Sequence, residues 1–170
     1  MMTQHVLPAM RRSRQQLDEG TCRAVLARGT SGVLSLKDEV YPYSTPISYA
    51  TDGDVIYFHG AVVGHKLDVL EHDPHASFVV IDQDLVVPEK FTTYFRSVVC
   101  YGTVRKVEDD AEKRRGIELI GHKYSPEVPE ELLQEEISGA WNRMVVLAMD
   151  IDAMSGKEAI ELVRERAKSV

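Results

Sequence analysis

The ten residues from Tyr57 to Lys66, YFHGAVVGHK, combine two glycines with a histidine–lysine pair. Glycine lets backbone amides approach a ligand closely, and a helix that begins here offers N–H groups without partners. The side chains of His65 and Lys66 add hydrogen-bond donors and positive charge. A phosphate monoester needs such groups, because its oxygens accept several converging donors and pair with a firm cation. The segment therefore predicts an anion site at a strand-to-helix turn.

Two other interpretations of this segment compete with the anion site. A nucleotide P-loop has four residues between its glycines and a Ser or Thr after its lysine. Here three residues separate Gly60 from Gly64, and Leu67 follows the lysine, so the pattern disfavours a nucleoside triphosphatase. An ordinary strand-to-helix turn with a solvated lysine has the same residues, and this segment alone does not decide between that turn and an anion site.

A second polar position lies in the segment from Thr93 to Val104, TYFRSVVCYGTV. Alternation along a strand places the hydroxyl of Ser97 within an otherwise apolar row, and Arg96 lies beside it. Ser97 is either a donor to a phosphate or a strand serine that bonds a neighbouring backbone group. The sequence leaves both interpretations open.

Strands and short helices must position these residues. Alternating and β-branched residues predict six strands, over residues 32–36, 43–50, 54–59, 76–81, 92–107 and 144–151. An Asp-Gly step at Asp52 and Gly53 predicts a tight antiparallel hairpin, because it supports positive φ values. Helices are predicted over residues 13–28, 66–71, 111–121 and 156–168. Capping boxes support the last two helices, through Asp109 with Glu112 and Ser155 with Glu158.

The predicted fold is mainly β, with antiparallel strands and helices at the ends and in the connections. This pattern favours a small closed barrel over a doubly wound parallel sheet. A length of 170 residues fits one domain that covers residues 1–170. Residues 125–136, with two prolines and several glutamates, predict an exposed loop that leads into a short acidic helix.

Composition excludes several classes of function. The formal net charge of −7 argues against a nucleic-acid partner, because phosphate neutralisation requires a basic surplus. We find no signal-like segment and no run of the roughly 18 apolar residues that span a membrane, so we expect a cytoplasmic protein with no membrane partner. Cys22 and Cys100 have no disulfide-framework or metal-site spacing. His72 and His75, in HDPH, predict a solvated turn, and we expect no metal.

The order of PISY, YFHGAVVGHK and FRSVVCYG, spread over most of residues 11–122, resembles the FMN-binding split β-barrels related to pyridoxamine 5′-phosphate oxidase. Within them, the chain is most similar to the branch that contains nitroimidazole-resistance reductases. A strand ending in FHGA, followed by Gly-x-Lys, is the most specific of these motifs. The resemblance implies a split barrel with peripheral helices and a homodimer that holds FMN at the subunit interface.

The resemblance also implies roles for particular residues. One strand would run its backbone along the isoalloxazine ring, through Ser44, Thr45, Pro46, Ile47, Ser48 and Tyr49. His59 and Gly60 would approach the ring or the ribityl chain. His65 and Lys66 match the basic pair that grips the phosphate in the oxidases, where the first of the pair is arginine. Ser97 matches a cofactor-contacting position where the oxidases carry glutamine, and Arg96 stands beside it.

Such a protein would be an oxidoreductase that passes electrons from a reduced donor, such as NADH or NADPH, to a small-molecule substrate such as a nitroaromatic or quinone. His59 is the candidate catalytic residue, facing the substrate. The alternative is a module that binds or senses flavin, or another planar cofactor, without turnover. Pyridoxamine 5′-phosphate oxidation is less favoured, because the chain closes with EAIELVRERAKSV in place of the oxidases' Trp- and Arg-containing segment.

Overall fold

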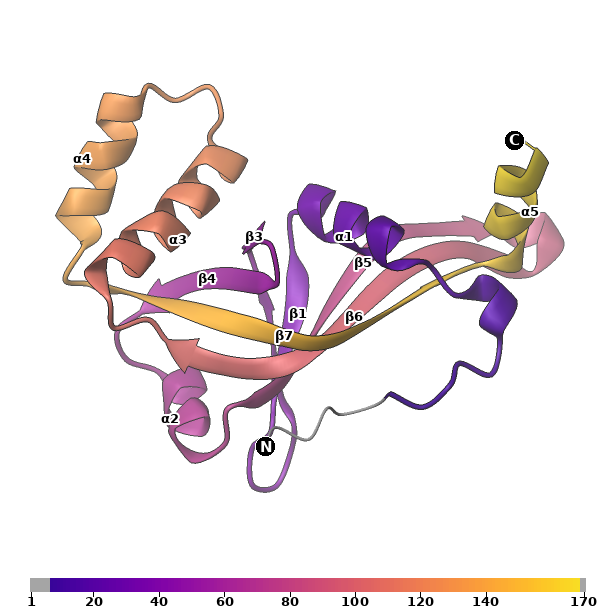
Figure 1. Ribbon diagram of the computed structural model, residues 1–170, viewed down its shortest axis with the longest axis horizontal. Helices are drawn as coiled ribbons and strands as arrows, with labels where there is room; N and C mark the ends of the chain where they lie inside the picture. The colour runs from indigo at the N-terminus through magenta and orange to yellow at the C-terminus, as the bar shows by residue number, and fades with distance from the viewer. Residues whose placement is uncertain (1–6, 169–170) are drawn as a thin grey trace.

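The computed structural model describes residues 7–168 of the chain (Figure 1). Its strands are β1 (Gly32–Leu36), β2 (Tyr43–Ile47), β3 (Ala50–Asp52), β4 (Val55–Ala61), β5 (His75–Val87), β6 (Thr92–Lys106) and β7 (Met144–Glu158). Its α-helices are α1 (Glu19–Arg28), α2 (His65–His72), α3 (Asp110–Tyr124), α4 (Glu130–Ala140) and α5 (Ile160–Lys168). Two short 3-10 turns are η1 (Ser13–Gln15) and η2 (Pro88–Lys90). No helix within residues 7–168 is long and apolar enough to cross a membrane.

The strands form one antiparallel sheet in the order β2-β1-β5-β6-β7-β4-β3. In Figure 1, β5, β6 and β7 run as a long twisted ribbon toward the end that carries α5, while α3 and α4 lie at the opposite end. The predicted fold, mainly β and antiparallel with peripheral helices, is confirmed. The Asp-Gly hairpin is also confirmed, because Gly53 joins β3 to β4 with a φ of 59°.

The sheet does not close into a complete barrel. Its edge strands β2 and β3 are consecutive in the sequence, but each of them pairs with one neighbour only. β3 pairs only with Val55, Ile56 and Tyr57 of β4, so beyond Tyr57 the edge of β4 that faces β3 has no strand partner within residues 7–168. The closed barrel expected from the strand pattern is therefore wrong, and the split barrel implied by the resemblance is confirmed.

The two largest of three hydrophobic clusters in the described residues cover the two faces of the sheet. The inner face of the sheet encloses the larger cluster, to which Phe58, Phe78 and Leu147 each contribute a fully buried side chain. A second cluster packs α3 and α4 against the opposite face of β4 and β7, and Tyr57 is its largest member. Neighbouring residues of β4 thus enter different clusters, because successive side chains in a strand point to opposite faces.

The predicted strand over residues 43–50 is broken in two. β2 ends at Ile47 and β3 begins at Ala50, so Ser48 and Tyr49 form the corner between the two edges of the sheet. The side chain of Tyr49 is fully buried, and its hydroxyl donates to the carbonyl of Leu26 at 2.7 Å. This buried anchor turns the chain from one edge to the other.

Both predicted terminal helices differ from the structure. The segment predicted as one helix over residues 13–28 is the turn η1 followed by α1, whose cap Asp18 accepts from the amide of Thr21 at 2.8 Å. The C-terminal helix begins at Ile160 rather than at 156, because β7 continues its pairing with β6 as far as Glu158. The predicted cap with Ser155 is therefore wrong, and Glu158 is buried at the end of a strand.

Candidate functional site

The start of α2 lies between the two free edges of the split barrel. On one side, the ring of His65 meets the ring of Tyr43 in β2 edge to face, with centroids 5.1 Å apart. On the other side, the Nζ atom of Lys66 is 3.2 Å from the point where a Cβ atom on Gly60 would stand. The residues from Gly60 to Lys66 therefore form a compact turn that touches both β2 and β4.

Lys66 combines partial burial with the absence of a partner. Its side chain is half-buried, and within residues 7–168 it makes no hydrogen bond and no ion pair. Burial lowers the pKa of its ammonium group, because removing a charge from water favours the neutral form. An anion bound beside Lys66 would restore that lost solvation with a charge-assisted contact. Lys66 is thus suited to hold a phosphate.

The backbone around Lys66 supports the same chemistry. Gly64 caps α2 with a φ of 145°, a conformation that disfavours any side chain. The amides of Leu67 and Asp68 bond back to the carbonyl of Gly64. The earlier amides, of His65 and Lys66, are among those that a helix start leaves without an intrahelical acceptor. These two amides belong to the same turn that carries the Lys66 side chain.

The imidazole of His65 already has a carboxylate partner. Its Nε2 atom lies 2.8 Å from a carboxylate oxygen of Asp38, in the loop between β1 and β2. The sequence grouped His65 with Lys66 as a basic pair, but it gave no sign that Asp38 would meet the imidazole. The phosphate contact of His65 stays a prediction, and Asp38 would compete for it.

His59 stands on the outer face of β4, opposite Val146 of β7. Its side chain is exposed, yet the surrounding protein lowers the pKa of its imidazole, first by desolvation and then by repulsion from Lys66. His59, Gly60 and Lys66 therefore lie together, as the sequence predicted. An imidazole held in its neutral form can accept or donate one hydrogen bond at the edge of a bound ring.

The predicted ring-binding segment offers mainly backbone to a ligand. Ser44 and Pro46 are exposed, Thr45 and Ile47 are half-buried, and Tyr49 is buried. The hydroxyl of Ser44 already bonds the hydroxyl of Ser35 at 2.8 Å. Because β2 is an edge strand, however, the backbone groups on its outer side are free of sheet partners.

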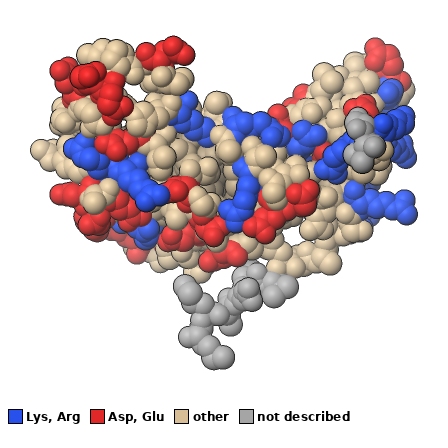
Figure 2. Space-filling view, turned by 45° about the horizontal axis from the view of Figure 1, so that its top comes forward, with Lys and Arg blue, Asp and Glu red and all other residues tan. Residues whose placement is uncertain are grey.

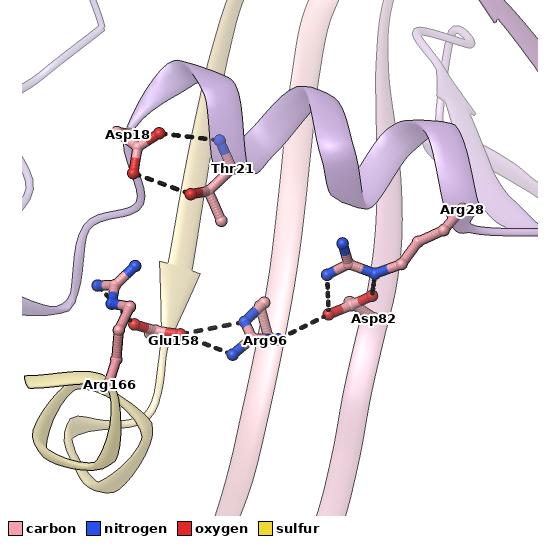
Figure 3. A network of polar contacts seen from close by, with 7 residues as sticks. All are labelled: Asp18, Thr21, Arg28, Asp82, Arg96, Glu158 and Arg166. Carbon is pink, nitrogen blue, oxygen red and sulfur yellow. Dashed lines mark hydrogen bonds and ion pairs between the residues drawn. The ribbon is translucent and has the colours of Figure 1, made fainter. Parts of the chain in front are cut away.

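Arg96 and Ser97 lie far from Lys66 within one chain. Val104 of β6 is beside α2, and the stretch from Arg96 to Val104 spans roughly 26 Å in an extended strand. Arg96 points into an ion-pair network, in which it meets Asp82 at 3.1 Å and the buried Glu158 at 3.0 Å (Figure 3). Ser97 faces the other way, on the outer face of the sheet between Ile81 and Lys157. Their cofactor contacts stay predictions.

Sequence reasoning placed His59 and Gly60 in the site, but it did not predict that the edge of β4 from Phe58 to Ala61 is unpaired on the side that faces β3. No local signal marks it, because the edge is free only where β3 stops short. Within residues 7–168, no group of three or more His, Cys, Asp or Glu side chains is arranged to hold a metal ion.

Comparison with known proteins places this geometry in context. Residues 18–158 match the model of a protein family described as pyridoxamine 5′-phosphate oxidase. No match is found among curated proteins.

Similar solved structures share the fold at low sequence identity. A candidate 5-nitroimidazole antibiotic resistance protein from Bacteroides thetaiotaomicron is 20% identical over 84% of this chain and 85% of that one, with a TM-score of 0.67. The flavocytochrome Anf3 from Azotobacter vinelandii is 21% identical over 89% of this chain and 72% of its own chain, with a TM-score of 0.70. An FAD and haem binding protein from Mycobacterium smegmatis is 19% identical over 86% of this chain and 73% of its own chain, with a TM-score of 0.67. At these identities the likeness concerns the fold alone.

Proposed function

The chain belongs to the pyridoxamine 5′-phosphate oxidase family, and we propose that it binds flavin mononucleotide with the phosphate at Lys66. The observation that carries this proposal is the half-buried ammonium group of Lys66, which has no partner in residues 7–168 and lies at a helix start. A phosphate dianion supplies the charge that this group lacks.

The rest of the cofactor follows the free strand edges. Gly60 would lie beside the ribityl chain, because its missing side chain lets the Nζ atom of Lys66 come close to the strand. The backbone of β2 along residues 44–48 would hold the flavin ring, and His59 would lie near it. Backbone N–H and C=O groups match the alternating donors and acceptors of the ring's polar edge.

A second copy of the chain completes the site in this proposal. A row of apolar residues crosses the outer face of the sheet, from Pro46 of β2 through Val33 and Val79 to Val99 of β6. Ser97 lies on the same face, next to the exposed Ile81. In a symmetric dimer that buries this face, Ser97 of one protomer can approach the cofactor held by the partner. This arrangement accounts for the distance between Ser97 and Lys66 within one chain.

The proposed activity is electron transfer to a small acceptor, such as a nitroaromatic or a quinone. A bound flavin supplies the redox chemistry, by accepting a hydride from a reduced donor and passing electrons on. The chain binds and orients the cofactor, and neutral His59 offers one hydrogen bond to a substrate at the ring. The fold resemblance to a resistance protein and to flavin-binding proteins supports this class of reaction.

The test of the phosphate site compares FMN with riboflavin, which lacks the phosphate. Lys66→Ala should weaken FMN binding roughly 30-fold, equivalent to about 2 kcal/mol, because it removes a charge-assisted contact. The affinity for riboflavin should stay within about twofold of the wild type. Quenching of flavin fluorescence measures both dissociation constants. Lys106→Ala is the matched control, because Lys106 is exposed and already pairs with Glu108.

The outcomes separate the steps of the proposal. If Lys66→Ala weakens riboflavin and FMN equally, the phosphate does not lie at Lys66. If wild-type protein binds neither flavin, the cofactor itself is wrong. Anaerobic addition of NADH or NADPH to the flavin-loaded protein should bleach the flavin absorbance. A flavin that neither donor reduces would favour the binding or sensing module.

A further inference from the structure

A positively charged cavity lies at the end of the molecule away from α2. Its volume is about 390 Å³, and its lining comes from the segment before α1 and the start of α5: Arg11, Arg12, Ser13, Arg14, Gln15 and Ile160. Figure 2 shows Lys and Arg side chains gathered at the end where α5 lies. This concentration of positive charge contrasts with the net charge of −7 for the whole chain.

Within residues 7–168 the side chains of the three arginines of this cavity have no anionic partner. The guanidinium groups of Arg11, Arg12 and Arg14 make no hydrogen bond and no ion pair in this part of the chain. Seven other arginines do pair with carboxylates: Arg23, Arg28, Arg96, Arg105, Arg114, Arg115 and Arg166. The acidic residues of α5, Glu161 and Glu165, act on Lys90 and do not line the cavity. The cavity is therefore not neutralised by its own walls.

Gln15 supplies an independent sign of a missing ligand. Its side chain is 5% exposed, and its Oε1 atom is enclosed without a hydrogen-bond partner in residues 7–168. Leaving a buried amide group unpaired costs about 1–3 kcal/mol. A half-turn of the amide exchanges its oxygen and nitrogen, so Gln15 can accept from a ligand hydroxyl or donate to a phosphate oxygen.

The main chain holds Gln15 firmly in this place. The amide of Gln15 donates to the carbonyl of Arg12 at 2.9 Å, which closes the turn η1. Gln16 then bridges to Lys157, and the amide of Leu17 donates to Gly156 at 2.9 Å. η1 is thus joined to the last residues of β7, which positions the three arginines around a fixed buried amide.

We propose that this cavity binds the phosphate group of a small molecule, at a site separate from the flavin phosphate site at Lys66. The arginines hold the anion through planar, multidentate contacts, Gln15 pairs with the ligand, and Ile160 gives an apolar surface for its body. A cavity of this volume accepts a molecule of the size of a mononucleotide. The ligand is therefore a phosphorylated small molecule or free phosphate.

Calorimetric titration of the full chain, first loaded with FMN at the Lys66 site and then separated from unbound FMN, tests the proposal. The probes are adenosine 5′-monophosphate, inorganic phosphate and adenosine. We expect the nucleotide to bind and adenosine to show no binding. The double variant R12A/R14A should weaken nucleotide binding at least tenfold. Phosphate binding as tight as the nucleotide's would identify free phosphate as the ligand, and weaker phosphate binding would identify a phosphorylated molecule.

Two further variants make the test specific. Arg164→Ala removes an exposed arginine of α5 that does not line the cavity, and it should change nucleotide affinity less than twofold. Gln15→Met keeps the length of the side chain and removes the unpaired amide. Without nucleotide, Gln15→Met should melt at a higher temperature than the wild type. Adding the nucleotide should raise the melting temperature of the wild type but not that of Gln15→Met. No binding of either anion, or equal affinity in wild type and R12A/R14A, would overturn the proposal. Flavin absorbance of each variant reports separately on the Lys66 site.

Discussion

The partly buried cations of this protein differ in whether an oppositely charged side chain lies beside them. Arg96 lies between two carboxylates, whereas Lys66 is half-buried with no partner in the described part of the chain. A buried charge that already has partners stabilises the fold and is not free for a ligand. A desolvated charge without a partner lowers stability until an anion arrives. We therefore expect FMN binding to depend on Lys66 much more than on Arg96.

The single residue His59 makes the free energy of unfolding depend on pH. Desolvation and the nearby Lys66 lower the pKa of the folded imidazole, while histidine in the unfolded chain titrates at about 6.5. Below that pH the unfolded chain binds more protons than the folded protein does. The stability that neutral His59 contributes is therefore present above about pH 6.5 and is lost as the pH falls toward the folded pKa.

Urea unfolding of the cofactor-free protein at several pH values checks this expectation. The free energy of unfolding should fall between about pH 7 and pH 5.5, and it should fall less in His59→Gln, which has no group to protonate there. Identical slopes in wild type and His59→Gln would contradict the assignment.

At the scale of elements, α3 and β4 approach closely at Gly116. A Cβ atom on Gly116 would stand 2.7 Å from the Cδ1 atom of Tyr57 and 3.0 Å from the Cγ1 atom of Val146. Helix propensity favours alanine over glycine, but overpacking of a buried contact costs more. The helix can lie this close to the sheet only because residue 116 has no side chain.

We expect Gly116→Ala to lower the free energy of unfolding by about 1–2 kcal/mol, through separation of α3 from the sheet. Gly139→Ala in α4 is the matched control, because its Cβ would meet nothing within 4 Å. That variant should be neutral or more stable by roughly 0.5–1 kcal/mol. Thermal or urea unfolding measures both. An equal effect of the two substitutions would show that helix propensity alone governs them.

At the scale of the whole molecule, the outer face of the sheet is the surface that we assign to dimerisation. Ile81 is 64% exposed on this face, and Tyr101 is 37% exposed. Both are large apolar residues, and contiguous apolar patches of this kind are typical of interaction surfaces. A symmetric dimer would remove them from water and place Ser97 near the partner's cofactor.

Ile81→Glu should convert the dimer to a monomer, because it places two like charges on a self-complementary apolar surface. Light scattering coupled to size-exclusion chromatography measures the molar mass. Val128→Glu is the control, since Val128 is also exposed but lies in the loop between α3 and α4. FMN affinity should fall together with dimerisation if the interface completes the site. A wild-type monomer, or a monomeric variant with unchanged FMN affinity, would contradict the shared site.

Local chemistry in the sequence was enough to predict much of this protein. The Asp-Gly hairpin, the helix after Gly64 and the antiparallel β-rich fold all depend on neighbouring residues, and all three are observed. Asp109 accepts from the amide of Glu112 at 2.8 Å as predicted, although the side chain of Glu112 pairs with Arg105. The grouping of Lys66 with His59 and Gly60 is local in the same sense.

Tertiary structure decided what depends on distant partners. β5 continues past the predicted end at 81 to Val87 despite its polar residues, because it pairs with β6 throughout. β7 likewise extends to Glu158, where Arg96 and Arg166 meet a carboxylate that local sequence predicted as a helix cap. Strand pairing also leaves β2 and the end of β4 unpaired with each other. Pairing between strands far apart in the sequence outweighs local propensity, and it alone determined which edge is free and which cations lack partners.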